Sequence, residues 1–338
     1  MLITIYVRSL LFCNKGELAM RKNRVKETLQ ITHPIILGGM GNISSPQLVA
    51  AVSNAGGLGT IGCGTMSKDE VKQLIAETKK RTNKPFAVNV AINVNEHVED
   101  IMQLIMDEKV PVASLSAGNP APYIPTLKEA GIKVITIVAA VKHAQKAEQA
   151  GADILVAEGF EAAGINSNLE LTTMTLIPQI AANVDTPVVA AGGIGDGRGL
   201  AAALMLGAEG VQMGTRFIAT EEAPFHNHYK TAVLNSSDTA TTIVGRTVGR
   251  TRRVIKGDYI EALLDKEKAG DLTLAEFDDL TAEDKHIQGA IQGDFKTGYM
   301  NAGQVAGLID AIPTVQQLID SMVQDAHEQI KHVQQHIL

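Results

Sequence analysis

The chain has 338 residues, 45% of them hydrophobic, and a formal net charge of -7. This length and apolar content suffice for one large core, or for a barrel with a smaller appended subdomain. The negative balance argues against nucleic acid as a partner, because phosphate contacts need clustered lysines and arginines.

The first 19 residues differ from the rest of the chain. The run MLITIYVRSLLFC is too short to span a bilayer, which needs about 20 apolar residues, and it lacks the basic start and cleavage site of a signal peptide. We interpret 1–19 as a non-native leader or misplaced start, with translation beginning at Met20. No membrane segment is expected, and two cysteines, Cys13 and Cys63, are too few for a disulfide framework, which favours the cytoplasm.

Short apolar runs rich in valine and isoleucine recur from residue 34 onward, separated by amphipathic stretches. They are mostly continuous rather than alternating, which is typical of strands buried on both faces of a parallel sheet. The predicted strands are 34–39, 58–63, 86–91, 112–117, 133–139, 154–159, 187–193 and 210–217.

The intervals between these strands carry helix signals. Ser67 followed three residues later by Glu70 has the pattern of a capping box. Gly131, Gly151 and Gly207 each follow a helical stretch, where a left-handed C-cap suits a glycine. The order of units predicts a closed (β/α)8 TIM barrel. An open doubly wound sheet is the alternative, and the absence of a GxGxxG after the first strand disfavours it.

The pattern changes after residue 235. We predict a barrel over 20–235 and a polar, loop-rich cap or lid over 236–300, inserted near the C-terminus and covering the barrel mouth. The segment 301–338 regains an apolar helical face, and 314–338 is predicted as one amphipathic helix. This tail is expected to pack back on the barrel wall.

Candidate ligand contacts follow the strands of the first half. Gly38, Gly39 and Met40 end the first strand, and paired glycines let a flat ligand approach the backbone, although tight turns are an equal explanation. Asn89 is an amide within an otherwise apolar strand. A buried polar group without a partner costs about 1–3 kcal/mol, so we expect Asn89 to contact a ligand rather than serve only as a structural amide. Ser116 ends the fourth strand.

Two glycine-rich loops follow the seventh and eighth strands, in AAGGIGDG and MGTRF. TIM barrels bind phosphate groups at these two positions through backbone N–H groups. The short side chains at Gly192, Gly193, Gly214 and Thr215 leave such groups open. The loops therefore predict a phosphate-bearing ligand.

Other polar residues give weaker signals. Glu158 ends the sixth strand and is interpreted as functional, although a carboxylate there can also cap the next helix. His143, His226 and His228 are interpreted as surface or helix residues, and no spacing predicts a metal site. The basic cluster within 246–253 could hold a nucleotide phosphate, but a solvated charged face is the default interpretation.

At these residues the chain resembles the nitronate monooxygenase (2-nitropropane dioxygenase) / FMN-dependent enoyl-acyl-carrier-protein reductase II family. The resemblance extends over about residues 25 to 312. It is carried by PIILGGMG, AVSNAGGLGTIG, KPFAVNV, SAGNP, AEGFEAAG, LTTMTLIPQI, PVVAAGGIGDG, LGAEGVQMGTRF and AGQVAGLI.

The resemblance implies FMN at the barrel mouth. It implies a phosphate on Gly193, Gly214 and Thr215. It implies a flavin ring against Gly39, Met40 and Asn89, with Glu158 nearby. The implied phosphate position coincides with the glycine loops identified from the residues alone.

One departure from the family pattern concerns acid–base chemistry. The family phrase EAGGH ends in a histidine that is the proposed acid/base, and Ile165 stands at that position, followed by a short insertion. Isoleucine cannot transfer a proton, so oxidation of a neutral nitroalkane is doubtful, whereas a preformed nitronate needs no base. Asn166 and Ser167 could orient a substrate, but neither is a good base. The catalytic residue is therefore left unassigned.

The resemblance implies an FMN-dependent oxidoreductase acting on a small molecule. One assignment is nitronate oxidation with oxygen as co-substrate. The alternative is NADH- or NADPH-dependent reduction of an enoyl thioester, such as an acyl-carrier-protein ester, or of a quinone. A third hypothesis, from another class, is a flavin-binding protein with impaired catalysis. A homodimer is the oligomeric state we consider.

Overall fold

The structure is a computed structural model that describes residues 22–337, so the predicted leader over 1–19 lies outside the described residues. Parallel strands form a barrel in the order β1-β9-β8-β6-β5-β4-β3-β2, and a parallel bridge between Ile36 and Leu58 joins its two ends. The barrel strands are β1 Ile35–Leu37, β2 Gly59–Gly62, β3 Phe86–Ala91, β4 Val112–Ser116, β5 Lys133–Val138, β6 Ile154–Glu158, β8 Val188–Ala191 and β9 Gly210–Met213. The predicted (β/α)8 TIM barrel is confirmed.

The last predicted strand, 210–217, was too long. β9 ends at Met213, and the chain turns at Gly214 into the short helix α9, Thr215–Ile218. Gly214 leaves the extended conformation, with φ -115° and ψ -67°. Apolar residues continue through the turn into a buried helix, so the run of hydrophobic letters hides the end of the strand.

Helices surround the barrel, and the caps predicted from the sequence mark where several of them begin or end. Ser67 and Glu70 form both hydrogen bonds of a capping box at the start of α3. Gly131, Gly151 and Gly207 have φ of 78°, 98° and 99°, the left-handed conformation of a C-cap. The barrel helices are α2 Pro46–Asn54, α3 Lys68–Arg81, α4 Val98–Asp107, α5 Ile124–Glu129, α6 Val141–Ala150, α7 Thr173–Ala181, α8 Gly197–Met205 and α10 Asn227–Leu234.

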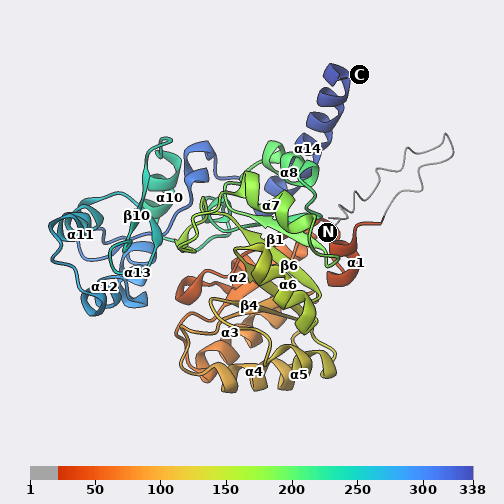
Figure 1. Ribbon diagram of the computed structural model, residues 1–338, viewed down its shortest axis with the longest axis horizontal. Coiled ribbons are helices and arrows are strands. Elements are labelled where there is room, and N and C mark those ends of the chain that lie inside the picture. The colour runs from red at the N-terminus through yellow and green to blue at the C-terminus, as the bar shows by residue number, and fades with distance from the viewer. Residues whose placement is uncertain (1–21, 338) are drawn as a thin grey trace, which may run out of the picture.

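Helix α1 (Arg24–Leu29) closes the end of the barrel at which the strands begin. Its Val25 and Leu29 are buried in one cluster with inward-facing strand residues such as Ile36 and Ile154. The opposite end, where the strands finish, is therefore the end that can hold a ligand (Figure 1).

The cap is a compact unit at one side of the barrel mouth (Figure 1). It contains β10 Thr241–Val244, β11 Arg252–Ile255, α11 Asp258–Ala269, α12 Leu274–Leu280 and α13 Glu283–Ala290. Phe277 and Tyr299 belong to its own small core. The expectation of a loop-rich segment was wrong, because these short helices have few apolar positions and give a weak periodic pattern.

Several contacts join the cap to the barrel, and two of them lie beside the barrel mouth. β11 pairs antiparallel with β7 (Gly164–Ile165), a two-residue strand in the loop after β6. Helix α13 lies against the 3-10 turn η1 (Gly41–Ile43) that follows β1. The cap therefore forms part of the wall of the barrel mouth.

The chain returns to the barrel through the 3-10 helix η2 (Gln304–Leu308) and ends in α14 (Val315–Ile337). α14 packs on α8, where a Cβ on Gly197 would lie 2.4 Å from the Cβ of Asp325. Glycine is therefore required for this close approach. The last turns of α14 extend away from the barrel (Figure 1). Among the described residues, no helix is long and apolar enough to cross a membrane.

Candidate active site

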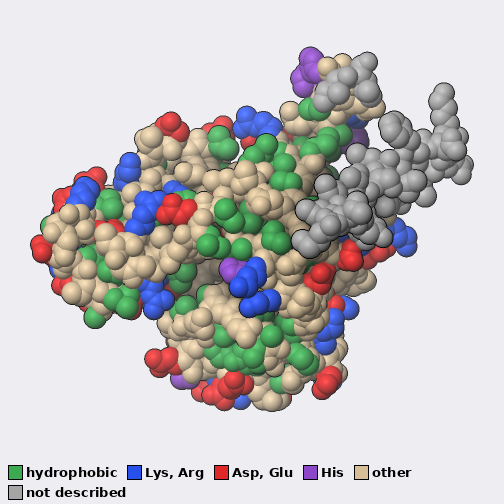
Figure 2. All heavy atoms as spheres, viewed as in Figure 1, with side chains coloured by type: hydrophobic (Ala, Val, Ile, Leu, Met, Phe, Trp, Pro, Cys, Tyr) green, Lys and Arg blue, Asp and Glu red, His purple; other side chains and the backbone are tan. Residues whose placement is uncertain are grey.

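A cavity of about 1100 Å³ lies at the carboxyl ends of the barrel strands. This volume lies just above the range of about 300–1,000 Å³ that is usual for a ligand pocket. Figure 2 shows the hollow between the cap and the barrel. The site residues predicted from the sequence that line the cavity are Gly38, Gly39, Met40, Asn89, Ser116, Glu158, Gly192, Gly193, Gly214 and Thr215.

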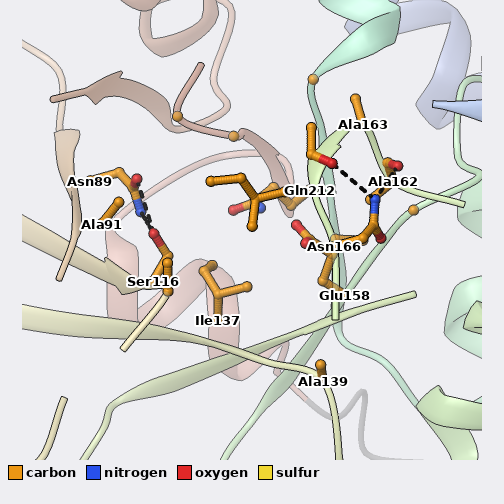
Figure 3. A pocket seen from close by; sticks show the side chains of 18 of the residues that line it. Asn89, Ala91, Ser116, Ile137, Ala139, Glu158, Ala162, Ala163, Asn166 and Gln212 are labelled. Carbon is orange, nitrogen blue, oxygen red and sulfur yellow. Dashed lines mark hydrogen bonds between the residues drawn. The ribbon is translucent and has the colours of Figure 1, made fainter. Parts of the chain in front are cut away.

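Asn89 and Ser116 lie on one wall of this cavity (Figure 3). The Asn89 amide donates to the hydroxyls of Ser114 and Ser116, with N–O distances of 3.1 and 3.2 Å. A Cβ on Gly39 would lie 2.7 Å from the Cβ of Asn89. The strands β1 and β3 therefore approach closely here, and the Asn89 amide is hydrogen-bonded within the protein while it lines the cavity.

The two glycine loops lie on the other wall. Gly192 and Gly193 have φ of 97° and 73°, and a Cβ on Gly192 would meet the Gly159 carbonyl at 2.8 Å. A Cβ on Gly214 would meet no atom within 4 Å. Within residues 22–337, no hydrogen bond leaves the backbone amides of Gly193, Gly214 or Thr215. These open amides and the empty space beside Gly214 fit an anionic group such as a phosphate.

The segment after the cap holds the loops after β6 and β9 in position. The Gly303 amide donates to the Thr215 hydroxyl at 2.9 Å, and the Gln304 amide donates to the Glu161 carbonyl at 2.9 Å. A Cβ on Gly303 would lie 2.7 Å from that carbonyl. Gly303 therefore fits between the loops after β6 and β9.

Glu158 and Gln212 face the cavity together, with Asn166 beside them (Figure 3). Among the described residues, the Glu158 carboxylate has no hydrogen-bond or ion-pair partner. Burial raises its pKa from 4.5 to about 7. Glu158 therefore exchanges a proton near neutral pH. Gln212 was not predicted as a site residue, although it is an amide in an apolar strand, which is the signal that identified Asn89.

Glu161 has the helix-capping role that was the alternative interpretation of Glu158. Its oxygens accept hydrogen bonds from the Thr173 amide at 3.0 Å and from the Thr173 hydroxyl at 2.9 Å. Thr173 is the first residue of α7. Glu161 thus caps α7, whereas Glu158 faces the cavity.

The loop that departs from the family pattern is tied to the cap. Ile165 is 49% exposed and lines the cavity from β7. The Asn166 amide donates to the Ala162 carbonyl at 2.9 Å, and the Ser167 hydroxyl accepts from the Leu169 amide at 3.2 Å. Both polar side chains therefore stabilise the loop itself.

The basic cluster is not a solvated face, contrary to the default interpretation. Arg253 is only 4% exposed and donates to the Phe160 carbonyl. Arg252 lines the cavity and donates to the Tyr299 hydroxyl at 2.6 Å. Only part of the cluster is solvated, because Arg253 makes a buried contact from the cap to the barrel and Arg252 bonds to Tyr299 within the cap.

Besides Arg252 of the basic cluster, the cavity is lined by residues that were not predicted from the sequence: Glu283 and His286 of the cap, and Asn301 directly after it. Of the histidines considered from sequence, His143 lies on α6 and also lines the cavity, exposed to solvent. Cys63 is buried, and burial raises its pKa to about 12. Cys63 therefore does not supply a thiolate at neutral pH.

Comparisons with known proteins agree with this geometry. The family model described as nitronate monooxygenase matches residues 22–103 and 92–325. The solved structure of FabK from Thermotoga maritima has a TM-score of 0.89 and 40% identity, and the match covers 94% of this chain and 99% of that one.

Curated relatives differ in their names. A probable nitronate monooxygenase from Staphylococcus saprophyticus is 37% identical over 284 residues, 71% of this chain and 80% of that protein. A hydroxy-methyl-oxo-octahydro-indene-carboxyl-CoA dehydrogenase from Rhodococcus jostii is 34% identical over 347 residues, 91% and 97% of the two chains. The chain therefore belongs to the nitronate monooxygenase family and is an FMN-dependent oxidoreductase.

Proposed function

We propose that FMN binds in the cavity at the barrel mouth. Its phosphate would be held by the backbone amides of Gly193, Gly214 and Thr215. The free amides, and the open space that a Cβ on Gly214 would occupy, support this assignment. The flavin, when bound, supplies the electron-accepting chemistry, and the protein supplies binding and orientation.

The flavin ring is assigned to the opposite wall, against Gly38, Gly39, Met40 and Asn89. The small residues of β1 leave room for a flat group to approach the backbone. Ser116, Glu158 and Gly192 complete the proposed binding set. The cap over 236–300 is proposed as a lid that separates the reacting atoms from water.

We propose oxidation of a small nitronate-type anion, with oxygen as co-substrate. The single observation that carries this choice is the Arg252 guanidinium in the cavity wall. Its Nη1 donates to the Tyr299 hydroxyl at 2.6 Å, which fixes the orientation of the guanidinium in this wall. A guanidinium binds paired oxygens in a fixed geometry, and a nitronate presents two such oxygens.

A second candidate is NAD(P)H-dependent reduction of an acyl thioester or a quinone-like acceptor. It is favoured by the match to FabK over 94% of this chain. The volume of about 1100 Å³ also suits an elongated substrate. A catalytically impaired flavin-binding protein is the third hypothesis, and steady turnover with any electron donor would exclude it.

Anaerobic mixing of the flavin-loaded protein with each electron donor separates these functions. Loss of flavin absorbance with a nitronate, but not with NADH or NADPH, supports the oxidase. Rapid loss with either nicotinamide supports the reductase. Light scattering tests the homodimer, and fractionation of the native cells tests the cytoplasmic location.

A further inference from the structure

The cavity extends beyond the barrel mouth along helix α6. His143, Lys146, Ala147 and Ala150 of this helix all line it. Their spacing of three and four residues places them on one face of the helix. The loop after β4, residues 117–121, lines the same cavity. A groove that is continuous with the cavity therefore runs between this loop and α6.

The groove is open to solvent. The side chains of His143 and Lys146 are exposed, whereas Ala147 is only 2% exposed. Small side chains at Ala121, Ala147 and Ala150 leave space between the two walls. Figure 2 shows basic and histidine side chains gathered at the edge of the hollow between the cap and the barrel. A molecule that enters the cavity from solvent can therefore reach these side chains.

Acidic side chains do not compensate the basic ones in this groove. Glu148 is the one acidic residue of α6, and its carboxylate accepts hydrogen bonds from the backbone amides of Asp185 and Thr186, both at 2.7 Å. It therefore faces the start of β8 instead of the groove. The opposite wall, 117–121, contains no ionisable residue.

The basic side chains of the groove are also unpaired. Within the described chain, the side chains of His143 and Lys146 have no hydrogen-bond or ion-pair partner. Lys128 on α5 differs, because it pairs with Asp153 at 3.1 Å. In the opposite wall, the Asn119 side chain accepts a hydrogen bond from the loop backbone at 3.2 Å through its oxygen, which leaves its amide group to donate. The groove therefore offers positive charge and donors to an anion.

The proposed FMN site does not use this groove. In the barrel order, β4 lies four strands away from β9, so the groove is across the mouth from Gly214. Lys146 lies about 7.5 Å along α6 from the first residue of the helix, at 1.5 Å per residue. A small nitronate beside the flavin ring would not extend this far. The groove suits the distal part of a longer molecule.

We propose that the groove beside His143 and Lys146 binds a phosphate monoester at the distal end of an elongated co-substrate. This inference rests on the second candidate function. A phosphate monoester carries a charge of about -1.5 to -2 near pH 7 and three acceptor oxygens. Lys146 pairs with it as a point charge, and His143 donates from its ring. Two sources have this chemistry, the 2′-phosphate of NADPH and the 3′-phosphate of a CoA thioester.

The test measures binding apart from turnover. Isothermal titration calorimetry of the oxidised flavin-loaded protein, in about 0.15 M salt, uses NADP+, NAD+, CoA and dephospho-CoA. Each pair of probes differs by one phosphate monoester. The variant is Lys146→Met. The matched control is Lys142→Met, which removes an exposed lysine of the same helix that does not line the cavity. Lysine and methionine have similar helix propensities, so both variants should fold.

We expect wild type to bind NADP+ more tightly than NAD+, or CoA more tightly than dephospho-CoA, by about fivefold or more. Lys146→Met should lose this preference while its affinity for the probe without the monoester stays within twofold of wild type. Lys142→Met should keep the preference, as should Lys146→Arg, which retains the charge. The pair of probes that shows the preference identifies the source of the phosphate.

Three results would overturn the inference: wild type that binds neither NADP+ nor CoA, equal losses for both members of a pair in Lys146→Met, or an equal loss of preference in Lys142→Met. Anaerobic flavin bleaching by NADH and NADPH is measured on the same proteins. Bleaching of wild type, with no effect of Lys146→Met on any probe, would overturn the inference and retain the second candidate function. Absence of bleaching with either nicotinamide would instead count against that function, while the titrations still decide whether the groove binds phosphate.

Discussion

Arg252 of the cap lies opposite Ile165 of the barrel loop in the antiparallel pair between β11 and β7. This pairing places Arg252 next to the position where the family pattern has a histidine, and both residues line the cavity. The wall of the cavity thereby gains a hydrogen-bond donor of fixed charge beside an apolar side chain. The site is suited to holding an anion there rather than to moving a proton from that loop.

Substitution of Arg252 tests its role in anion binding. We expect Arg252→Met to raise the KM for propyl-1-nitronate about tenfold or more, because a hydrogen bond to a charged group contributes about 1.5–3 kcal/mol. FMN content should not change. Arg246→Met is the control, since Arg246 is 51% exposed and pairs with Glu170. Equal KM values in the two variants would remove Arg252 from the site.

Substitution of Gly214 tests whether the FMN phosphate lies beside this residue. A Cβ there meets no protein atom within 4 Å, so the apo-protein should tolerate Gly214→Val. In the holo-protein the added side chain would occupy ligand space, and we expect FMN affinity to fall about tenfold or more. Gly257→Val, at a cap glycine with equally open space, is the control in fluorescence titrations. Wild-type affinity in Gly214→Val would contradict the assignment.

The raised pKa of Glu158 should make the stability of the FMN-free protein depend on pH. Because burial raises its pKa from 4.5 to about 7, the folded state binds this proton more tightly than the unfolded state. Its stabilising contribution is complete below about pH 4.5 and is lost as the pH rises through 7.

Glu158→Gln should therefore be more stable than wild type at about pH 8, by about 2 kcal/mol, and similar to it at about pH 4.5. Urea unfolding of the two proteins at both pH values measures the difference. A stability difference that does not change with pH would show that this carboxyl titrates normally.

Substitution of Gly197 tests how much the packing of the C-terminal helix contributes to the free energy of unfolding. Its missing Cβ allows α14 to approach α8, and an added Cβ would lie 2.8 Å from the Met322 carbonyl. We expect Gly197→Val to lower the free energy of unfolding by about 2–3 kcal/mol. Ala202→Val, exposed on the same helix, should change it little. Equal melting temperatures for the two variants would exclude this close packing.

The barrel could be predicted from sequence because its strands are buried on both faces, which yields continuous apolar runs. The glycine loops could be predicted because their positions after the last two strands have a known use in barrels. Gln212 is an amide within an apolar strand, as Asn89 is, but it was not predicted as a site residue. His286 and Asn301 could not be found, because only the folding of the cap brings them to the cavity beside Gly164.

The visible absorbance spectrum of the purified protein, before and after incubation with FMN and removal of free flavin, tests the central claim most directly. We predict a bound flavin spectrum with about one FMN per chain, weaker in Gly214→Val and kept in Gly257→Val. A colourless wild-type protein that retains no added FMN would contradict the proposed site.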